Sequence, residues 1–244
     1  MEQKLLIDNK NYITYKIFDN NSKFDFDILY LHGFCGDMDG IKGALIENIA
    51  KNNNIGLIKL NYLGHGTSSG NMTDFTITDW FNNIKTIINK FANKKLLIIG
   101  SSMGGWFSYL TALEYPNKIK GILTFAAAID FLTILIKPIA NLNQEIVYKI
   151  KSNSETSKEH LITKKLLLDS EKYNLFDRNN LTFNFPIRML HGMCDNIIPY
   201  NISIKFAEKV KCKDLQLNII KNADHKFTME NNQEILKKAI EECI

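Results

Sequence analysis

The chain has 244 residues, a length near the upper end of a single domain and sufficient for one large hydrophobic core. Its hydrophobic share of 45% and charged share of 23% are ordinary for a globular protein and argue against a disordered or membrane-spanning class. The net charge of +4 comes from lysines and arginines that are scattered along the chain, so we expect no nucleic-acid partner.

Neither a membrane segment nor a disulfide framework is predicted. No stretch approaches the ~18 apolar residues of a membrane span, and the first residues lack the apolar run of a signal peptide. The four cysteines show no C-x-x-C spacing, so we expect reduced thiols, although Cys35 and Cys194 lie beside motifs described below. We therefore expect a cytoplasmic protein with no stable membrane insertion.

Strands and helices are predicted to alternate along the first half of the chain. Residues 5–8 and 12–18, separated by a turn-prone 9–11, predict an antiparallel hairpin at the edge of a sheet. Continuous apolar runs, typical of strands buried on both faces, occur at residues 28–31 and 96–99, and further strands are predicted at 55–60 and 122–125. Helical spacing of apolar residues occurs at 41–51, 78–91 and 104–115. This order predicts an α/β fold with a mostly parallel sheet and helices on both faces.

The alternation fails between residues 128 and 185. Residues 131–139 are strongly apolar, whereas 141–158 are polar and helix-prone. We interpret this part as a helical lid inserted into a single domain that spans residues 1–244. The alternation resumes with strands at 187–192 and 215–220 and helices at 201–210 and 231–242.

The motif with the clearest chemistry is Gly100-Ser101-Ser102-Met103-Gly104, which fits the pattern G-x-S-x-G. A strand that turns abruptly into a helix crowds the positions two before and two after the turn, so that only glycine fits there. The central Ser102 then projects above the edge of the sheet. Such a serine is a candidate nucleophile.

A serine nucleophile needs a base to take its proton. Of the five histidines, His32, His65 and His191 each precede a glycine at or just after a strand end, where we expect them to shape loops. His160 falls in the predicted lid. His225 alone follows the last strand, and it is our candidate base.

The base in turn needs a carboxylate to fix its tautomer. Asp195 follows the strand at 187–192, and the chain order Ser102, Asp195, His225 is that of the α/β-hydrolases. Asp130, after the strand that ends near Phe125, is the alternative acid. A different interpretation of Asp130 is a helix N-cap in the lid.

Two backbone N–H groups are expected to bind the oxyanion of a tetrahedral intermediate. Met103 follows the nucleophile at a helix N-terminus and supplies one of them. The loop His32-Gly33-Phe34-Cys35-Gly36 follows a predicted strand, and the N–H of Phe34 is the candidate for the second.

Apolar side chains at the start of the lid are candidates for an acyl-binding pocket. They are Ile129, Phe131, Leu132 and Leu135, with Trp106 from the predicted helix that follows Ser102. The alternative is that they only pack the lid and the helix against the sheet, as any inner face must.

Taken together, these motifs resemble the α/β-hydrolase superfamily over nearly the whole chain. The stretches G-S-S-M-G-G-W, L-H-G-F-C-G-D-M, G-H-G-T-S, L-H-G-M-C-D-N-I-I-P and A-D-H-K-F are similar to one branch, the palmitoyl-protein thioesterases and acyl-glucuronide esterases. The resemblance implies hydrolysis of acyl thioesters or esters with Ser102, Asp195 and His225 as the triad. The chain departs from that branch at Asn61, where relatives often have Asp, and at residues 126–129, where prolines are common.

We expect a serine hydrolase that forms an acyl-enzyme on an ester, a thioester or an acylated protein and needs no cofactor or metal. Two alternatives remain within the hydrolases: a general short-chain carboxylesterase, and a small amide or peptide hydrolase. The alternative from another class is a ligand-binding relative without catalysis, which an intact set of Ser102, Asp195 and His225 argues against.

Overall fold

An eight-stranded sheet forms the centre of the molecule, in the order β1-β2-β4-β3-β5-β6-β10-β12. The computed structural model describes residues 1–18, 24–150, 159–227 and 230–244. The strands of the sheet are β1 (Gln3–Leu6), β2 (Tyr12–Phe18), β3 (Phe26–Leu31), β4 (Gly56–Asn61), β5 (Lys95–Ser101), β6 (Ile119–Phe125), β10 (Ile187–Gly192) and β12 (Leu215–Ile220). The strands from β4 to β12 pair in parallel, whereas β1 and β2 are antiparallel at one edge. This confirms the predicted sheet and its edge hairpin.

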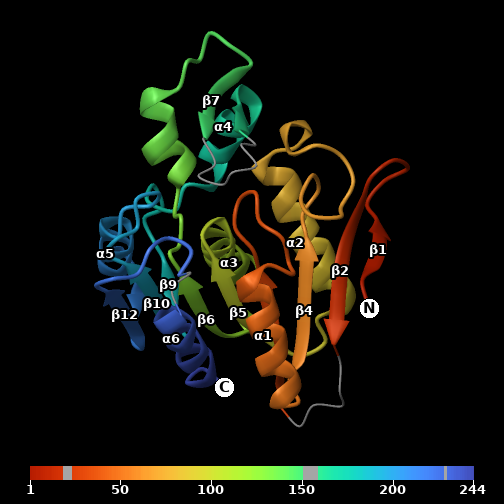
Figure 1. Cartoon of the computed structure of the whole chain (residues 1–244), viewed down its shortest axis with the longest axis vertical. Helices are drawn as coiled ribbons and strands as arrows, with labels where there is room; N and C mark the ends of the chain where they lie inside the picture. Colours follow the sequence, from red (N-terminus) through yellow and green to blue (C-terminus); the bar gives the residue numbers. More distant parts are fainter. Residues whose placement is uncertain (19–23, 151–158, 228–229) are drawn as a thin grey trace.

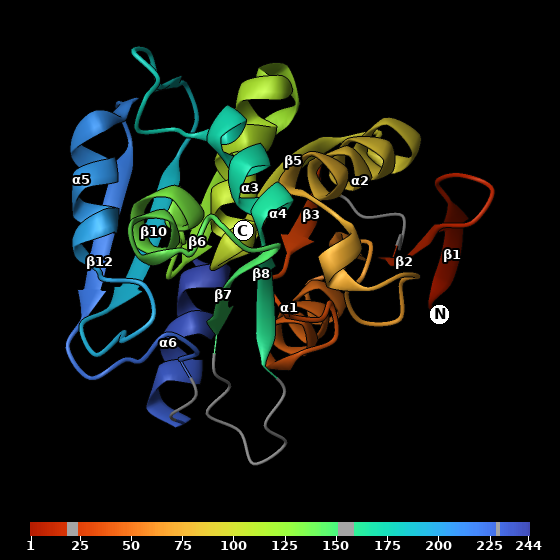
Figure 2. The ribbon, with the colours of Figure 1, turned by 90° about the horizontal axis from the view of Figure 1, so that it is seen from above.

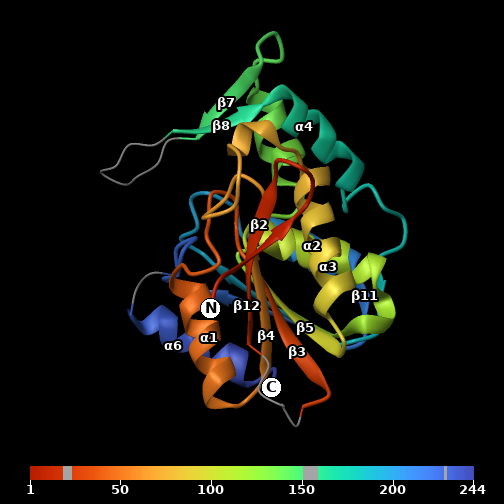
Figure 3. The same ribbon diagram turned by 90° about the vertical axis from the view of Figure 1, so that its right-hand side faces the viewer.

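Helices cover both faces of the sheet (Figure 3). One face is covered by α1 (Ile41–Asn52) and α6 (Glu230–Glu241). The other is covered by α2 (Ile77–Phe91), α3 (Met103–Glu114) and α5 (Asn201–Lys209). The shorter elements outside the sheet are η1 (Met72–Asp74), η2 (Pro116–Lys118) and β11 (Lys211–Cys212).

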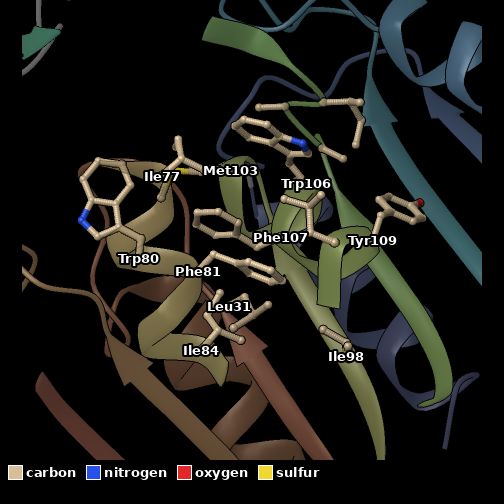
Figure 4. Close-up of a cluster of buried hydrophobic side chains, with 14 of the residues drawn as sticks. Leu31, Ile77, Trp80, Phe81, Ile84, Ile98, Met103, Trp106, Phe107 and Tyr109 are labelled. Carbon is tan, nitrogen blue, oxygen red and sulfur yellow. The ribbon is translucent and has the colours of Figure 1, made fainter. Parts of the chain in front are cut away.

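The largest apolar cluster lies under α2 and α3 (Figure 4). Thr76 starts α2 as an N-cap, and a capping box with Asp79 satisfies backbone N–H groups that have no partner within the helix. The apolar stripe predicted for this helix is buried through Trp80, Phe81 and Ile84 against the sheet. This packing fixes α3, and with it the turn that carries Ser102.

The residues from 128 to 185, which we call the insertion, lie between the neighbouring strands β6 and β10. Its elements are η3 (Leu132–Ile136), η4 (Lys137–Ile139), β7 (Ile146–Ile150), β8 (His160–Thr163), α4 (Lys164–Ser170), η5 (Glu171–Tyr173) and β9 (Thr182–Phe183). Figures 1 and 2 show β7 and α4 of the insertion over the end of the sheet to which the parallel strands point, whereas β9 pairs with β11. The site at the carboxyl ends of the strands is therefore covered by a segment of its own chain.

The predicted helix at 141–158 is wrong where the structure describes it. Residues Ile146–Ile150 form β7, which pairs antiparallel with β8, and residues 151–158 lie outside the described part. The run Ile146-Val147-Tyr148 is rich in residues that favour strands, and Val147 is buried in the main cluster. A neighbouring strand to pair with thus outweighed the helix propensity of the flanking polar residues.

A buried cation stands in the middle of β4. The side chain of Lys59 is 1% exposed, and its Nζ lies 2.7 Å from Asp39 Oδ1 and 2.5 Å from Glu47 Oε2. Lys51 also pairs with Glu47, and Lys16 pairs with Asp39. Hydrogen bonds from Lys51 and then Lys59 lower the pKa of Glu47 to about 2, so this carboxylate stays ionised across the physiological range.

We predict that Lys59→Met flattens the acid dependence of stability. A lowered pKa of Glu47 contributes stability that is complete above the ordinary value of 4.5 and is lost as pH falls toward about 2. Without Lys59 much of this contribution is absent at every pH. Thermal unfolding followed between pH about 5 and about 2 measures the difference. Lys16→Met is the matched control, because this lysine is 28% exposed and its pair with Asp39 contributes less; an acid dependence equal to that of the unsubstituted protein in Lys59→Met contradicts the prediction.

Candidate active site

The turn between β5 and α3 holds Ser102 in a strained conformation. Its φ is +56° and its ψ is −120°, values that side-chain-bearing residues rarely adopt. The N–H of Ser102 donates to the carbonyl of Phe125 at 2.9 Å, which anchors the turn to the neighbouring strand. A Cβ at Gly100 would overlap the backbone of Gly104, and a Cβ at Gly104 would overlap the carbonyl of Leu31. The two glycines are therefore required by close approach of backbones, as the motif predicts.

The structure brings the three predicted triad residues together. His225 Nε2 lies 3.0 Å from Ser102 Oγ, and His225 Nδ1 lies 2.7 Å from Asp195 Oδ2. Ser102 is half-buried, and the side chain of His225 is 13% exposed. An imidazole between a hydroxyl and a carboxylate can accept a proton at Nε2 while Nδ1 stays bonded to the acid.

The carboxylate of Asp195 is surrounded by donors. Its Oδ1 accepts from the amides of Ile197 and Ile198 at 2.9 and 2.8 Å, and its Oδ2 accepts from His225 and also from His191 Nε2 at 3.1 Å. Burial alone would raise the pKa of Asp195, but the bonds from both imidazoles and from the Ile198 amide hold it well below its usual range. Asp195 thus remains a carboxylate despite a side chain with 0% exposure.

Asp130, the alternative acid, points elsewhere. Its carboxylate accepts from the N–H of Leu175 at 2.8 and 2.9 Å and from the N–H of Phe176 at 2.8 Å, so it joins the start of the insertion to a later part of it. Burial raises the pKa of Asp130 to about 6. It caps no helix with its side chain, contrary to the second interpretation offered for it.

The two amides expected to bind an oxyanion belong to Met103, next to Ser102 in the chain, and to Phe34, in a loop that passes Ser102. Among the described residues, no hydrogen bond from the N–H of Phe34 or of Met103 is formed. A Cβ built on Gly33 would lie 2.9 Å from Ser102 Cβ and 3.5 Å from Ser102 Oγ, so the loop before Phe34 passes directly beside the nucleophile. Next in this loop, Cys35 has a φ of +58° and its Sγ contacts Met72.

Two of the remaining histidines are buried beside this loop. His32 and His65 are 1% and 3% exposed, and their ring centroids are 5.4 Å apart. Burial lowers the pKa of His32 to about 4 and that of His65 to about 3, so both are neutral. His32 Nδ1 contacts the carbonyl of Gly33 and His65 Nδ1 that of Leu63, so both rings bind the backbone of their own loops, in agreement with the expectation. His191 was also expected to shape a loop, but it donates to Asp195, a contact that sequence reasoning missed.

The predicted acyl-binding residues are mostly buried, and all of them except Trp106 belong to the insertion itself. Trp106, Ile129 and Leu132 are 0% exposed, Phe131 is 6% exposed and Leu135 is half-buried. The ring of Phe131 lies 6.0 Å from that of Phe34 and 6.2 Å from that of Trp106. Trp106 also donates to the carbonyl of Tyr173 at 3.2 Å. An apolar aromatic path therefore leads from the loop beside Ser102 into the insertion.

In the described part of the chain, no three His, Cys, Asp or Glu side chains gather as a metal site would require. Within the same residues, none of the helices is long and apolar enough to cross a membrane.

The strand order, the glycine-flanked turn and the layers of helices define an α/β-hydrolase. Residues 25–182 match the family described as serine aminopeptidase, S33, and the chain belongs to this family. The "Palmitoyl-protein thioesterase ABHD10, mitochondrial" of Bos taurus is 27% identical over 222 residues, which cover 89% of this chain and 72% of that protein.

Solved structures give the same fold. The mouse alpha/beta hydrolase domain-containing protein 10 has a TM-score of 0.89 at 24% identity, covering 99% of this chain and 97% of that one. A putative hydrolase from Agrobacterium vitis S4 has a TM-score of 0.89 at 24% identity, and the match covers 100% of this chain and 98% of that one. The predicted fold class and resemblance are thereby confirmed. The thioesterase of Bos taurus is named as mitochondrial, whereas a cytoplasmic location for this chain stays a prediction.

We predict that Gly104→Ala destabilises the protein by more than about 2 kcal/mol, because the new Cβ overlaps the Leu31 carbonyl of β3 and overpacking there outweighs the higher helix propensity of alanine. Urea unfolding measures the loss. Gly40→Ala is the matched control, since the nearest atom to its Cβ is Asp37 O at 3.4 Å, an ordinary contact. Equal stability of the two variants contradicts this account of the turn.

Proposed function

We propose that this chain is a serine hydrolase that cleaves acyl thioesters or carboxylic esters through an acyl-enzyme intermediate. The observation that supports it most directly is the continuous line of hydrogen bonds from Ser102 Oγ through His225 to Asp195, at 3.0 and 2.7 Å. A thiolate or an alkoxide would be the leaving group. The cofactor-free chemistry requires only groups that this chain supplies.

In the proposed mechanism, His225 Nε2 takes the proton of Ser102 Oγ while the oxygen attacks the acyl carbonyl carbon. The negative charge on the carbonyl oxygen is stabilised by the N–H groups of Phe34 and Met103. The intermediate collapses, the leaving group departs with the proton from His225, and Ser102 retains the acyl group. Water, deprotonated by His225, then attacks the acyl-serine; as the bond from the acyl carbon to Ser102 Oγ breaks, His225 returns the proton to Oγ, and the acid is released. Asp195 stays ionised throughout and stabilises the imidazolium.

An acyl substrate is favoured by the aromatic path beside Ser102. Phe34 is half-buried and packs against Phe131, which packs against Trp106, so these rings continue the apolar interior from the loop beside Ser102 into the insertion. Burying each methylene of an acyl chain against such surface contributes about 0.8 kcal/mol. The palmitoyl-protein thioesterases among the relatives agree with a long-chain thioester, whose thiolate leaves with little protonation.

A small peptide or amide hydrolase is the second candidate, because the family description contains the word aminopeptidase. Such an enzyme would need a free carboxylate to bind the ammonium of its substrate. The buried carboxylates of Asp130 and Asp195 are both already occupied by hydrogen bonds. The acyl ester or thioester is therefore the better-supported substrate.

We predict that Ser102→Ala and His225→Gln each reduce hydrolysis of acyl thioesters by at least about 1000-fold. The first substitution removes the attacking oxygen, and the second removes the base that takes its proton. Steady-state hydrolysis of matched thioester, ester and aminoacyl-amide substrates measures this. His160→Gln is the control, since this histidine lies in the insertion on β8. Undiminished turnover by Ser102→Ala would contradict the proposal. If the unsubstituted protein hydrolyses only the aminoacyl amide, the second candidate is favoured.

We predict that Phe131→Ala lowers kcat/KM for long-chain acyl thioesters about tenfold, since loss of one aromatic wall removes roughly 1.5 kcal/mol of apolar contact. Short-chain substrates, which do not reach this ring, should change by much less. Ile139→Ala is the control because that side chain is on the insertion but 61% exposed. The same loss for short and long chains would show that Phe131 acts on the fold rather than on the acyl group.

A further inference from the structure

His191 is a buried titratable residue that the proposed mechanism leaves without a role. It lies at the end of β10, is 0% exposed, and has partners at both ring nitrogens. Its Nε2 is 3.1 Å from Asp195 Oδ2 and 2.9 Å from the carbonyl of Ile198, while its Nδ1 is 2.7 Å from Ser203 Oγ. His191 and His225 contact the same oxygen of Asp195, and of these two imidazoles it is His225 that also contacts Ser102 Oγ.

The partners determine which nitrogen of His191 has the proton. A carboxylate and a carbonyl can only accept, so Nε2 must be the donor. When the ring has this single proton, Nδ1 is an acceptor, and the hydroxyl of Ser203 donates to it. Ser203 is 1% exposed at the start of α5, so water does not replace it in this role. The other tautomer would place a lone pair against two oxygens and is excluded on electrostatic grounds.

The same carboxylate oxygen of Asp195 therefore accepts from two imidazoles. The bond from His191 stabilises the negative charge on Oδ2 and holds the oxygen in the plane in which His225 approaches. Each bond weakens the other, because both draw on one charge. His191 thus bears on both the position of His225 and the affinity of His225 for its proton.

We infer that His191 is a positioning residue for the triad: it orients Asp195 and limits how strongly this carboxylate stabilises protonated His225, and Ser203 fixes the tautomer that makes this possible. The inference rests on the proposed function of Ser102, Asp195 and His225. It adds two residues to those that act on the acid: His191 of β10, which contacts Asp195, and Ser203 of α5, which contacts His191.

Other charged groups near the triad are common to every variant of His191. Lys42 on α1 donates to the carbonyl of Lys226 at 2.9 Å, and its ammonium interacts with the charges of Asp224, Lys226 and Asp195. Burial lowers the pKa of Lys42 to about 8, so its charge is constant below about pH 7. A change in that range on substitution of His191 is therefore not due to Lys42.

The test is the rate at which a fluorophosphonate labels Ser102, measured from about pH 5 to about pH 8. The serine oxygen displaces fluoride from phosphorus, so the rate reports the nucleophile without a known substrate. His191→Leu removes the donor, whereas His191→Gln places an amide N–H where Nε2 lies. Ser203→Ala removes only the hydroxyl, and its matched control is Ser170→Ala, which removes a buried hydroxyl bonded to Leu167 on α4.

The acid limb is the range in which the labelling rate falls as the pH is lowered, and the plateau is the constant rate above it. In His191→Leu we expect the pH at the midpoint of the acid limb to rise by roughly half a unit, because Asp195 then interacts with one imidazole fewer. We expect the plateau rate to fall about tenfold, because Asp195 is less well oriented. His191→Gln should recover most of both. Ser203→Ala should move the limb in the same direction by less, and Ser170→Ala should not move it.

An unchanged limb in His191→Leu, or the same limb in His191→Gln and His191→Leu, overturns the inference and makes His191 a packing residue only. If His191→Leu does not fold, the comparison of Ser203→Ala with Ser170→Ala decides, and equal limbs in these two overturn the inference. A different result identifies failure of the proposed function: the unsubstituted protein is then not labelled, or Ser102→Ala is labelled equally.

Discussion

The positive-φ turn at Ser102 is the constraint on which the rest of the site depends. Strain of this kind costs roughly 1–3 kcal/mol and persists only where the surroundings enforce it. Here the Phe125 carbonyl accepts the N–H of Ser102, and α3 packs so closely on β3 that Gly104 has no room for a Cβ. The apolar packing of α2 and α3 in Figure 4 supplies the energy that holds this approach. The stability of the sheet and the geometry of the nucleophile are thus set by the same contacts.

Charge at the site is balanced by donors rather than by opposite ions. A buried carboxylate is costly unless its oxygens are bonded, and Asp195 meets four N–H groups, two from the backbone and two from imidazoles. Lys59 is treated differently, because its buried ammonium is paired with two acids that reach partly into water. The charge of Asp195 is thus held at the triad, where the proposed reaction needs it. The charge of Lys59 instead joins β4 to the two acids around it.

Sequence reasoning recovered what local sterics and chain order determine. The glycines around Ser102 follow from the sterics of a strand-to-helix turn, and the placement of Asp195 and His225 follows because the loops of parallel strands meet at one edge. The contact between His191 and Asp195 could not be foreseen, since a histidine before a glycine fits any loop. Its one signal was its place at the end of the strand that leads to the acid. The buried partners of Lys59 were hidden for a related reason, because they come from distant parts of the chain.

The insertion was recognised as a break in the alternation, but not in its detail. Its strands β7 and β8 depend on each other, and short segments with mixed propensity take the structure that a partner stabilises. Asp130 shows how the insertion is joined to the site. This residue follows β6, has a φ of +50°, and accepts from the amides of Leu175 and Phe176 at the far side of the insertion. Its neighbour Phe131 stands between the rings of Phe34 and Trp106. The junction that holds the insertion in place therefore also sets the aromatic path along which an acyl chain would meet Ser102.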